Sequence, residues 1–139
     1  MTTTTTTLAD RLRAWAKGIY AHEAGVELLI RHGKAIYEGA PWINDDGELA
    51  WLDTGALLDG CGAWSGGEQR IVHLAVSLIG DERVDLAEVL SGNDRHTTAL
   101  VLAAIAHASG THEATEVQFT ADGRHRLTRP GTLYAWPDE

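Results

Sequence analysis

The sequence predicts a mainly α protein: a compact bundle of about five helices with a small C-terminal β-hairpin. Apolar residues recur at helical spacing along most of the chain, and Ser, Thr, Asp or Asn precedes these stretches as a helix start signal. After Gly110 the composition changes, and an Asp-Gly turn lies between apolar residues. With 44% hydrophobic and 22% charged residues, the 139 residues are enough for one folded domain.

The first predicted helix begins at Leu8, after a threonine-rich stretch (residues 1–7) that is expected to be a flexible tail because it has no apolar group to bury. Its apolar stripe has spacings of four, three and four residues: Leu8, Leu12, Trp15 and Ile19. A second helix is expected from about 21 to 32, with Gly33 as its stop. The short turn between them predicts two neighbouring helices.

Residues 34–63 are less regular, since Pro41, several glycines and clustered acids interrupt the pattern; here only 48–58 is expected to form a short helix. The clearest start signal follows. Ser65 and Glu68 have the spacing of a capping box and open a run of almost wholly apolar residues to Ile79, with Gly80 after its end. A helix this apolar is expected to be central to the core.

Two more helices are predicted before the composition changes. Asp85 begins a short helix to about Leu90, and Asn93 or Asp94 begins a long alanine-rich helix to Gly110. Residues 111–139 then form a hairpin around Asp122-Gly123 or an extended, docked tail. We therefore divide the chain into a tail at 1–7, a helical domain at 8–110 and a hairpin or docked tail at 111–139.

The net charge of −9 is unevenly distributed. Residues 35–69 carry seven acidic residues and no Lys or Arg, and this field repels phosphates. Binding to nucleic acid is therefore disfavoured, except through a basic set in the first helices: Arg11, Arg13, Lys17, Arg31 and Lys34.

The sequence also bears on the compartment. No apolar run approaches the roughly 20 residues that span a bilayer. The N-terminus lacks the order of a secretory signal, and the single cysteine, Cys61, cannot form an internal disulfide. We expect a cytoplasmic protein that does not bind membranes.

The acidic segment is the predicted partner-binding surface, because charge-rich loops are often solvated or partner-facing. It combines carboxylates with two tryptophans: Trp42, Asp45, Asp46, Glu48, Trp51 and Asp53. The same tryptophans are large enough to anchor the segment on the helical core. The expected partner is another protein, basic or neutral, or a second copy in a homo-oligomer.

The stretch Ser65-Gly66-Gly67-Glu68-Gln69-Arg70 resembles the signature loop of ABC-type ATPases. Those ATPases also need a Walker A loop, and the only Gly-Lys pair here, Gly33-Lys34, is followed by alanine, so the ATPase interpretation fails. The favoured interpretation is a helix start whose amides are satisfied by its own capping box. The alternative is a weak anion-binding site at Ser65, Gly66 and Gly67.

No catalytic residue can be named from the sequence, and we predict no cofactor. His107, His112 and Glu113 are the closest metal-ligand types, but their spacing matches no known metal motif, so no metal site is predicted. The enzyme alternative is a small pocket near His73, Cys61 and Ser65. We interpret Cys61 as unreactive and His73 as a satisfied core histidine.

Three stretches in order, DRLRAWAKGIYAHEAGVELLIRHG, WSGGEQRIVHLAVSLIG and VDLAEVLSGNDRHTTALVLAAIAHASG, resemble a group of short uncharacterised actinobacterial proteins over about residues 8–110. The resemblance implies a small helical domain in a bacterial cytoplasm or a mobile element, and no activity. We therefore predict a non-enzymatic interaction or accessory protein that acts through its acidic, tryptophan-bearing segment and its tails.

Overall fold

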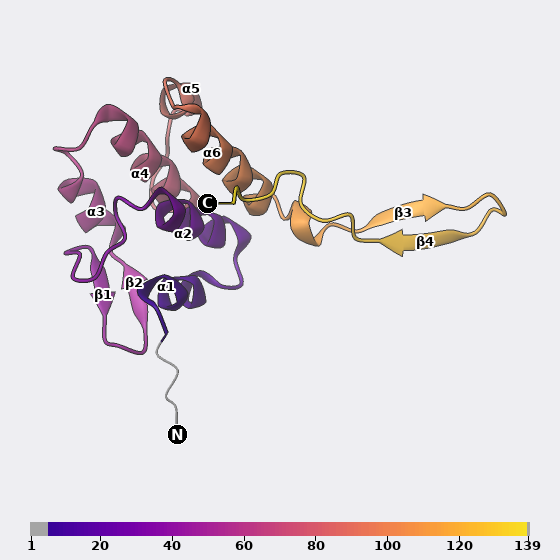
Figure 1. Ribbon diagram of the computed structural model, residues 1–139, viewed down its shortest axis with the longest axis horizontal. Helices are drawn as coiled ribbons and strands as arrows, with labels where there is room; N and C mark the ends of the chain where they lie inside the picture. The colour runs from indigo at the N-terminus through magenta and orange to yellow at the C-terminus, as the bar shows by residue number, and fades with distance from the viewer. Residues whose placement is uncertain (1–5, 139) are drawn as a thin grey trace.

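The computed structural model describes residues 6–138 and confirms a mainly α fold with a C-terminal β-hairpin (Figure 1). The tail predicted at 1–7 lies mostly outside the described residues. The elements in order are α1 (Leu8–Ala16), α2 (Tyr20–His32), β1 (Ile43–Asp45), β2 (Ala50–Leu52), α3 (Thr54–Gly60), α4 (Gly66–Ile79), α5 (Leu86–Leu90), α6 (Arg95–Ala108), a 3₁₀ turn η1 (Thr111–Glu113), β3 (Glu116–Phe119) and β4 (His125–Thr128).

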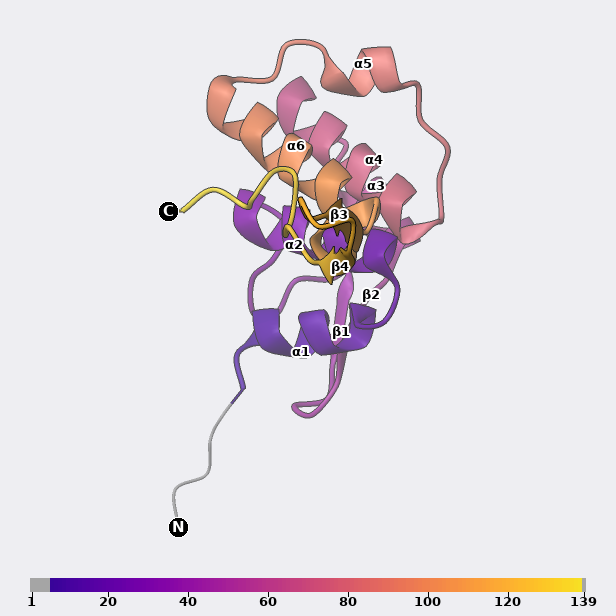
Figure 2. The same cartoon turned by 90° about the vertical axis from the view of Figure 1, so that its right-hand side faces the viewer.

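Helix α2 is the centre of the helical body. It packs against α4 and α6 on one side and against α1 on the other, an arrangement that Figures 1 and 2 show from two directions. The approach to α4 depends on Gly25, because a Cβ there would lie 2.7 Å from the Ala75 carbonyl oxygen. The predicted central helix, α4, supplies six buried residues to the core: Ile71, Val72, Leu74, Ala75, Val76 and Ile79.

Several predicted helix start and stop signals are confirmed, although α1 ends at Ala16, before Ile19 of its predicted apolar stripe. The Thr7 hydroxyl accepts the Asp10 N–H before α1, and Ser65 and Glu68 form the full capping box before α4. Gly80 follows α4 with φ of +103°, a left-handed conformation that glycine adopts without strain. These local signals therefore set the boundaries of the main helices.

The prediction of a helix over 48–58 is only partly right. Ala50–Leu52 forms strand β2, which pairs antiparallel with β1 across the Asp46-Gly47 turn, and the helix begins only at Thr54. In β2, Ala50 and Leu52 are buried while Trp51 points outward. This two-residue alternation is the signature of a half-buried strand, and it overrides the local helical pattern.

The second hairpin is built differently. Strands β3 and β4 pair antiparallel around the predicted Asp122-Gly123 turn and extend away from the helical body (Figure 1). In Figure 2 this protruding hairpin is seen end-on. We call residues 116–128 the arm. After it, the chain returns to the body, where Trp136 packs against the core and its ring receives the Arg31 guanidinium at 5.2 Å.

Candidate functional site

Trp42 does not belong to the predicted partner-binding surface. Its side chain is only 6% exposed, and its indole N–H donates to the Ala35 carbonyl at 2.7 Å. The Trp64 and Tyr37 rings pack edge-on against it, with centroids 5.6 and 5.8 Å away. Trp42 is therefore the anchor that holds the irregular segment on the core, with its one polar atom satisfied.

Asp45 is engaged within the chain. Arg11 binds it through two hydrogen bonds, Nε to Oδ1 at 3.1 Å and Nη2 to Oδ2 at 2.7 Å, and the Arg11 side chain is only 9% exposed. These bonds, with the Gly47 N–H, hold the pKa of Asp45 below its ordinary value. This bidentate ion pair fixes β1 to α1 and leaves the Asp45 carboxylate little capacity to bind a partner protein.

Two further predicted site residues have local roles. One Asp46 oxygen accepts the N–H groups of Glu48 and Leu49 and closes the β1–β2 turn, which lowers the pKa of Asp46. Asp53 is the N-cap of α3. The side chains that remain exposed in this region include both acidic and apolar groups, and we call them the acidic face: Glu38, Asp46, Glu48, Leu49 and Trp51.

The Ser65 loop is a capped helix start. Ser65 Oγ accepts the Glu68 N–H at 3.2 Å, and Glu68 Oε1 accepts the Ser65 N–H at 3.1 Å. The hydrogen bond from the Ser65 N–H lowers the pKa of the Glu68 carboxyl, so this carboxylate is charged at the helix N-terminus. An anion placed at Gly66 and Gly67 would meet this charge, but the Arg70 guanidinium also lies beside both glycines, so the alternative of an anion site there stays a prediction.

The structure places the three residues of the enzyme alternative in different settings. His73 lines a cleft of about 430 Å³ and its Nδ1 bonds the Glu82 carboxylate at 2.8 Å. Cys61 is buried, its thiol contacts the Leu58 carbonyl, and burial raises its pKa. Ser65 caps α4. Within residues 6–138, the lining of this cleft includes no Ser, Thr or Cys that His73 could activate.

The basic set of the first helices is largely occupied by internal acids. Arg13 and Arg31 bind Glu27, and Lys34 lies 3.7 Å from Glu68. With Arg11 held by Asp45, this pairing leaves little uncompensated positive charge for phosphates.

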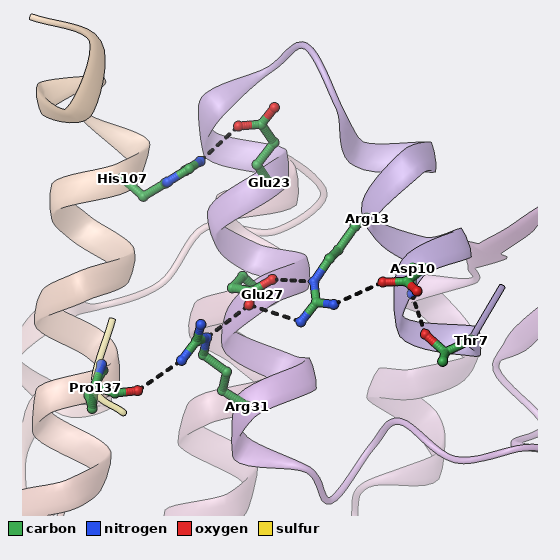
Figure 3. A network of polar contacts seen from close by, with 8 residues as sticks. All are labelled: Thr7, Asp10, Arg13, Glu23, Glu27, Arg31, His107 and Pro137. Atoms are coloured by element: carbon green, nitrogen blue, oxygen red, sulfur yellow. Dashed lines mark hydrogen bonds and ion pairs between the residues drawn. The ribbon is translucent and has the colours of Figure 1, made fainter. Parts of the chain in front are cut away.

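Glu27 is the centre of the polar network in Figure 3. Arg13 donates two hydrogen bonds to its carboxylate, at 2.8 and 3.1 Å, and Arg31 donates a third at 2.8 Å. Burial alone would raise the pKa of Glu27, but these bonds outweigh burial and hold the pKa below its ordinary value. Arg31 also donates to the Pro137 carbonyl, so the network connects α1, α2 and the C-terminal segment.

Glu27→Gln is expected to lower the free energy of unfolding by about 1–2 kcal/mol, a figure discounted for the partly exposed arginines. Because the folded-state pKa of Glu27 is lowered, its stabilisation is present above the ordinary glutamate pKa and is lost as the pH falls through the folded value. Urea unfolding from neutral to acid pH should therefore show a shallower acid decline for the variant. Equal declines in the variant, the wild type and the exposed-site control Glu48→Gln would contradict this role.

The arm has one apolar face without a cover. Val117 pairs with Leu127 and Phe119 with His125, so these four side chains share one face, and Gln118 and Arg126 lie on the other. Val117, Leu127 and Phe119 are 51%, 69% and 79% exposed. The arm also carries charges of both signs, Glu116 and Asp122 with Arg124 and Arg126, and Arg129 follows. An isolated two-stranded hairpin is marginally stable in water, so an uncovered apolar face indicates a binding surface.

Sequence reasoning placed the turn of the arm correctly, but it could not show that the arm would stand free of the bundle. It also missed a convergence at the base of the arm, where Glu23, His107 and His112 meet beside a cleft of about 310 Å³. The histidines were visible as a pair, whereas their acidic neighbour comes from a helix 84 residues away in the sequence.

Comparison with models of known protein families, with curated proteins and with solved structures finds no match to this chain. The resemblance to short actinobacterial proteins therefore stays a prediction, and function has to be inferred from the geometry of the chain itself. Within residues 6–138, no helix has both the length and the apolar composition that crossing a membrane requires.

Proposed function

We propose that this chain is a non-enzymatic protein-interaction protein that forms a homo-oligomer, in which the arm of one copy binds the acidic face of another. The observation that carries the proposal is the uncovered face of the arm, where Phe119 is 79% exposed. Covering Val117, Phe119 and Leu127 would contribute roughly 1–2 kcal/mol each, since all three are already partly shielded.

Charge complementarity favours a second copy as the occupant. The arm carries Arg124 next to its turn and Arg126 on the face opposite Phe119, together with the acids Glu116 and Asp122, and the Arg124 side chain is 87% exposed. The acidic face presents Glu38 and Glu48 with no Lys or Arg in residues 35–69. Opposite charges of this kind orient the encounter and set the register of an interface.

Apolar groups are available on both sides of the proposed contact. On the acidic face, Leu49 is 61% exposed and Trp51 is 40% exposed, and both alternate with the buried residues of β2. On the arm, the matching groups are Phe119 and Leu127. Large aromatic side chains surrounded by polar groups are the residues that dominate binding energy in interfaces.

Phe119→Ala is expected to weaken self-association by about 30-fold or more, the effect of losing one interface hot spot. Gln118→Ala is the matched control, because it shortens a side chain on the opposite face of the same strand without placing a charge beside Arg126. Sedimentation equilibrium of the wild type and the two variants measures the dissociation constants. A wild type that stays monomeric at every concentration, or equal weakening by the two substitutions, contradicts the proposal. Recovery of a different stoichiometric protein partner by a monomeric wild type also contradicts a homo-oligomer.

A further inference from the structure

Three metal-ligand side chains from separate elements meet at the base of the arm. Glu23 lies in α2, His107 in the last turn of α6 and His112 in η1, and one ligand atom from each lies within 4.8 Å of the others. His107 Nε2 and Glu23 Oε1 are 2.7 Å apart. Figure 3 shows these two side chains pointing toward one another from their helices.

The second histidine has a nitrogen without a partner. His112 Nδ1 is buried and makes no hydrogen bond within residues 6–138. The His107 and His112 rings stack with centroids 4.0 Å apart and an angle of 11°. A buried ring nitrogen that lacks a partner is uncommon in proteins, because leaving it unsatisfied costs free energy. A cation bound through Nδ1 would satisfy it.

Neighbouring groups hold this cluster in place. The Gly18 N–H donates to Glu23 Oε2 at 2.9 Å, which leaves Oε1 directed at His107. This bond and the one to His107 lower the pKa of Glu23, so its carboxylate is charged at neutral pH. The Tyr20 ring packs edge-on against His112 at 4.8 Å. Such outer contacts orient ligands and strengthen metal sites.

We propose that Glu23, His107 and His112 bind a divalent transition-metal ion, with Zn²⁺ as the best-suited ion. Two imidazole nitrogens and one carboxylate oxygen form a ligand set that Zn²⁺ takes, with a fourth position left for water or another ligand. Glu23 and His107 line the adjacent cleft, together with Arg13 and Lys17.

Metal binding requires a small rearrangement. With metal–ligand bonds of about 2.1 Å, tetrahedral ligand atoms lie about 3.4 Å apart, closer than the 4.8 Å limit of this cluster. His112 turns out of its stack with His107 so that the two ring planes converge on the ion. His107 binds through Nε2, so the proton that this nitrogen shares with Glu23 is released to solvent and the neutral ring carries its one proton on Nδ1.

The site would connect the base of the arm to the helical body. His112 lies in the turn between α6 and β3, and Glu23 belongs to the central helix α2. A bound ion would therefore restrict how the arm leaves the body. Metal binding itself does not depend on the proposed self-association, and the two can fail separately.

The test uses the metal-stripped, tag-free full chain, titrated with Co²⁺ by visible absorption and with Zn²⁺ by calorimetry. We expect one ion per chain, with the intense absorption bands of low-coordinate Co²⁺. Glu23→Gln and His112→Ala should each weaken binding by more than about 100-fold, the upper range for losing only an outer contact.

His96→Ala removes an exposed histidine elsewhere and should leave metal binding unchanged. Thermal unfolding serves as a second readout, because Zn²⁺ should raise the melting temperature of the wild type but not that of His112→Ala. Absence of stoichiometric binding to the wild type overturns the site, as does binding that His112→Ala leaves intact. Neither result bears on the association constants of the metal-free chain.

Discussion

Trp42→Ala is expected to lower the free energy of unfolding by about 3–5 kcal/mol, a large part of the 5–15 kcal/mol that stabilises a typical domain. The substitution removes the edge-on contacts with Tyr37 and Trp64 and leaves the Ala35 carbonyl without its indole donor. Trp42 also packs against Gly60, where a Cβ would lie 2.8 Å from its ring. Neighbouring groups are therefore too closely fitted to fill the cavity easily.

Trp51→Ala is the matched control for this prediction. Trp51 comes from the same segment but is 40% exposed, so its removal should cost less, about 1–2 kcal/mol. Urea unfolding at a protein concentration too low for self-association measures the free energy of unfolding of both variants. Equal losses of stability, or a Trp42 variant as stable as the wild type, would show that Trp42 is not the anchor of this segment.

Reversing the charge of the arm is expected to have the largest effect on association. In the double variant Arg124→Glu and Arg126→Glu, the arm would approach Glu38 and Glu48 of another copy with like charge. Like charges facing across an interface cost several kcal/mol, so we expect self-association to weaken by more than about 100-fold. Sedimentation velocity of the variant measures this loss.

Reversing the charge of the acidic face should also weaken self-association. Glu38→Arg with Glu48→Arg makes the acidic face basic, so the unchanged arm is repelled. Both glutamates are exposed, and Glu38 lies 3.7 Å from Arg11 but its side chain is 74% exposed, so losing this pair has a limited effect on folding. Thermal unfolding of both double variants should match that of the wild type. If either double variant associates as tightly as the wild type, the residues substituted in that variant do not belong to the interface.

The helices were predictable because their signals are local. The capping box at Ser65 and Glu68, the Thr7 cap and the glycine after Ile79 each act within a few residues, and the structure has them as expected. The Asp122-Gly123 pair, which forms the turn of the arm, is also a local sequence signal. Fold class and the C-terminal hairpin follow from these positions.

The errors came from contacts between distant residues. The Asp46-Gly47 pair carries the same turn signal as the arm, but the apolar pattern after it also fits a helix, so β1 and β2 were missed. The acidic segment looked free for a partner because nothing in its own sequence shows that Asp45 meets Arg11, 34 residues away. Likewise, Glu23 joins His107 and His112 only because α2 packs beside α6 in the folded chain.

Mixing the two charge-reversed double variants tests most directly whether the arm of one copy binds the acidic face of another. Each pairing of an arm with a face is then again between opposite charges, although both variants remain net acidic, so general attraction does not bring them together. Sedimentation velocity should show two monomeric proteins alone and a hetero-oligomer in the mixture, with affinity near that of the wild type. If the wild type associates but the mixture stays monomeric, the arm does not bind the acidic face.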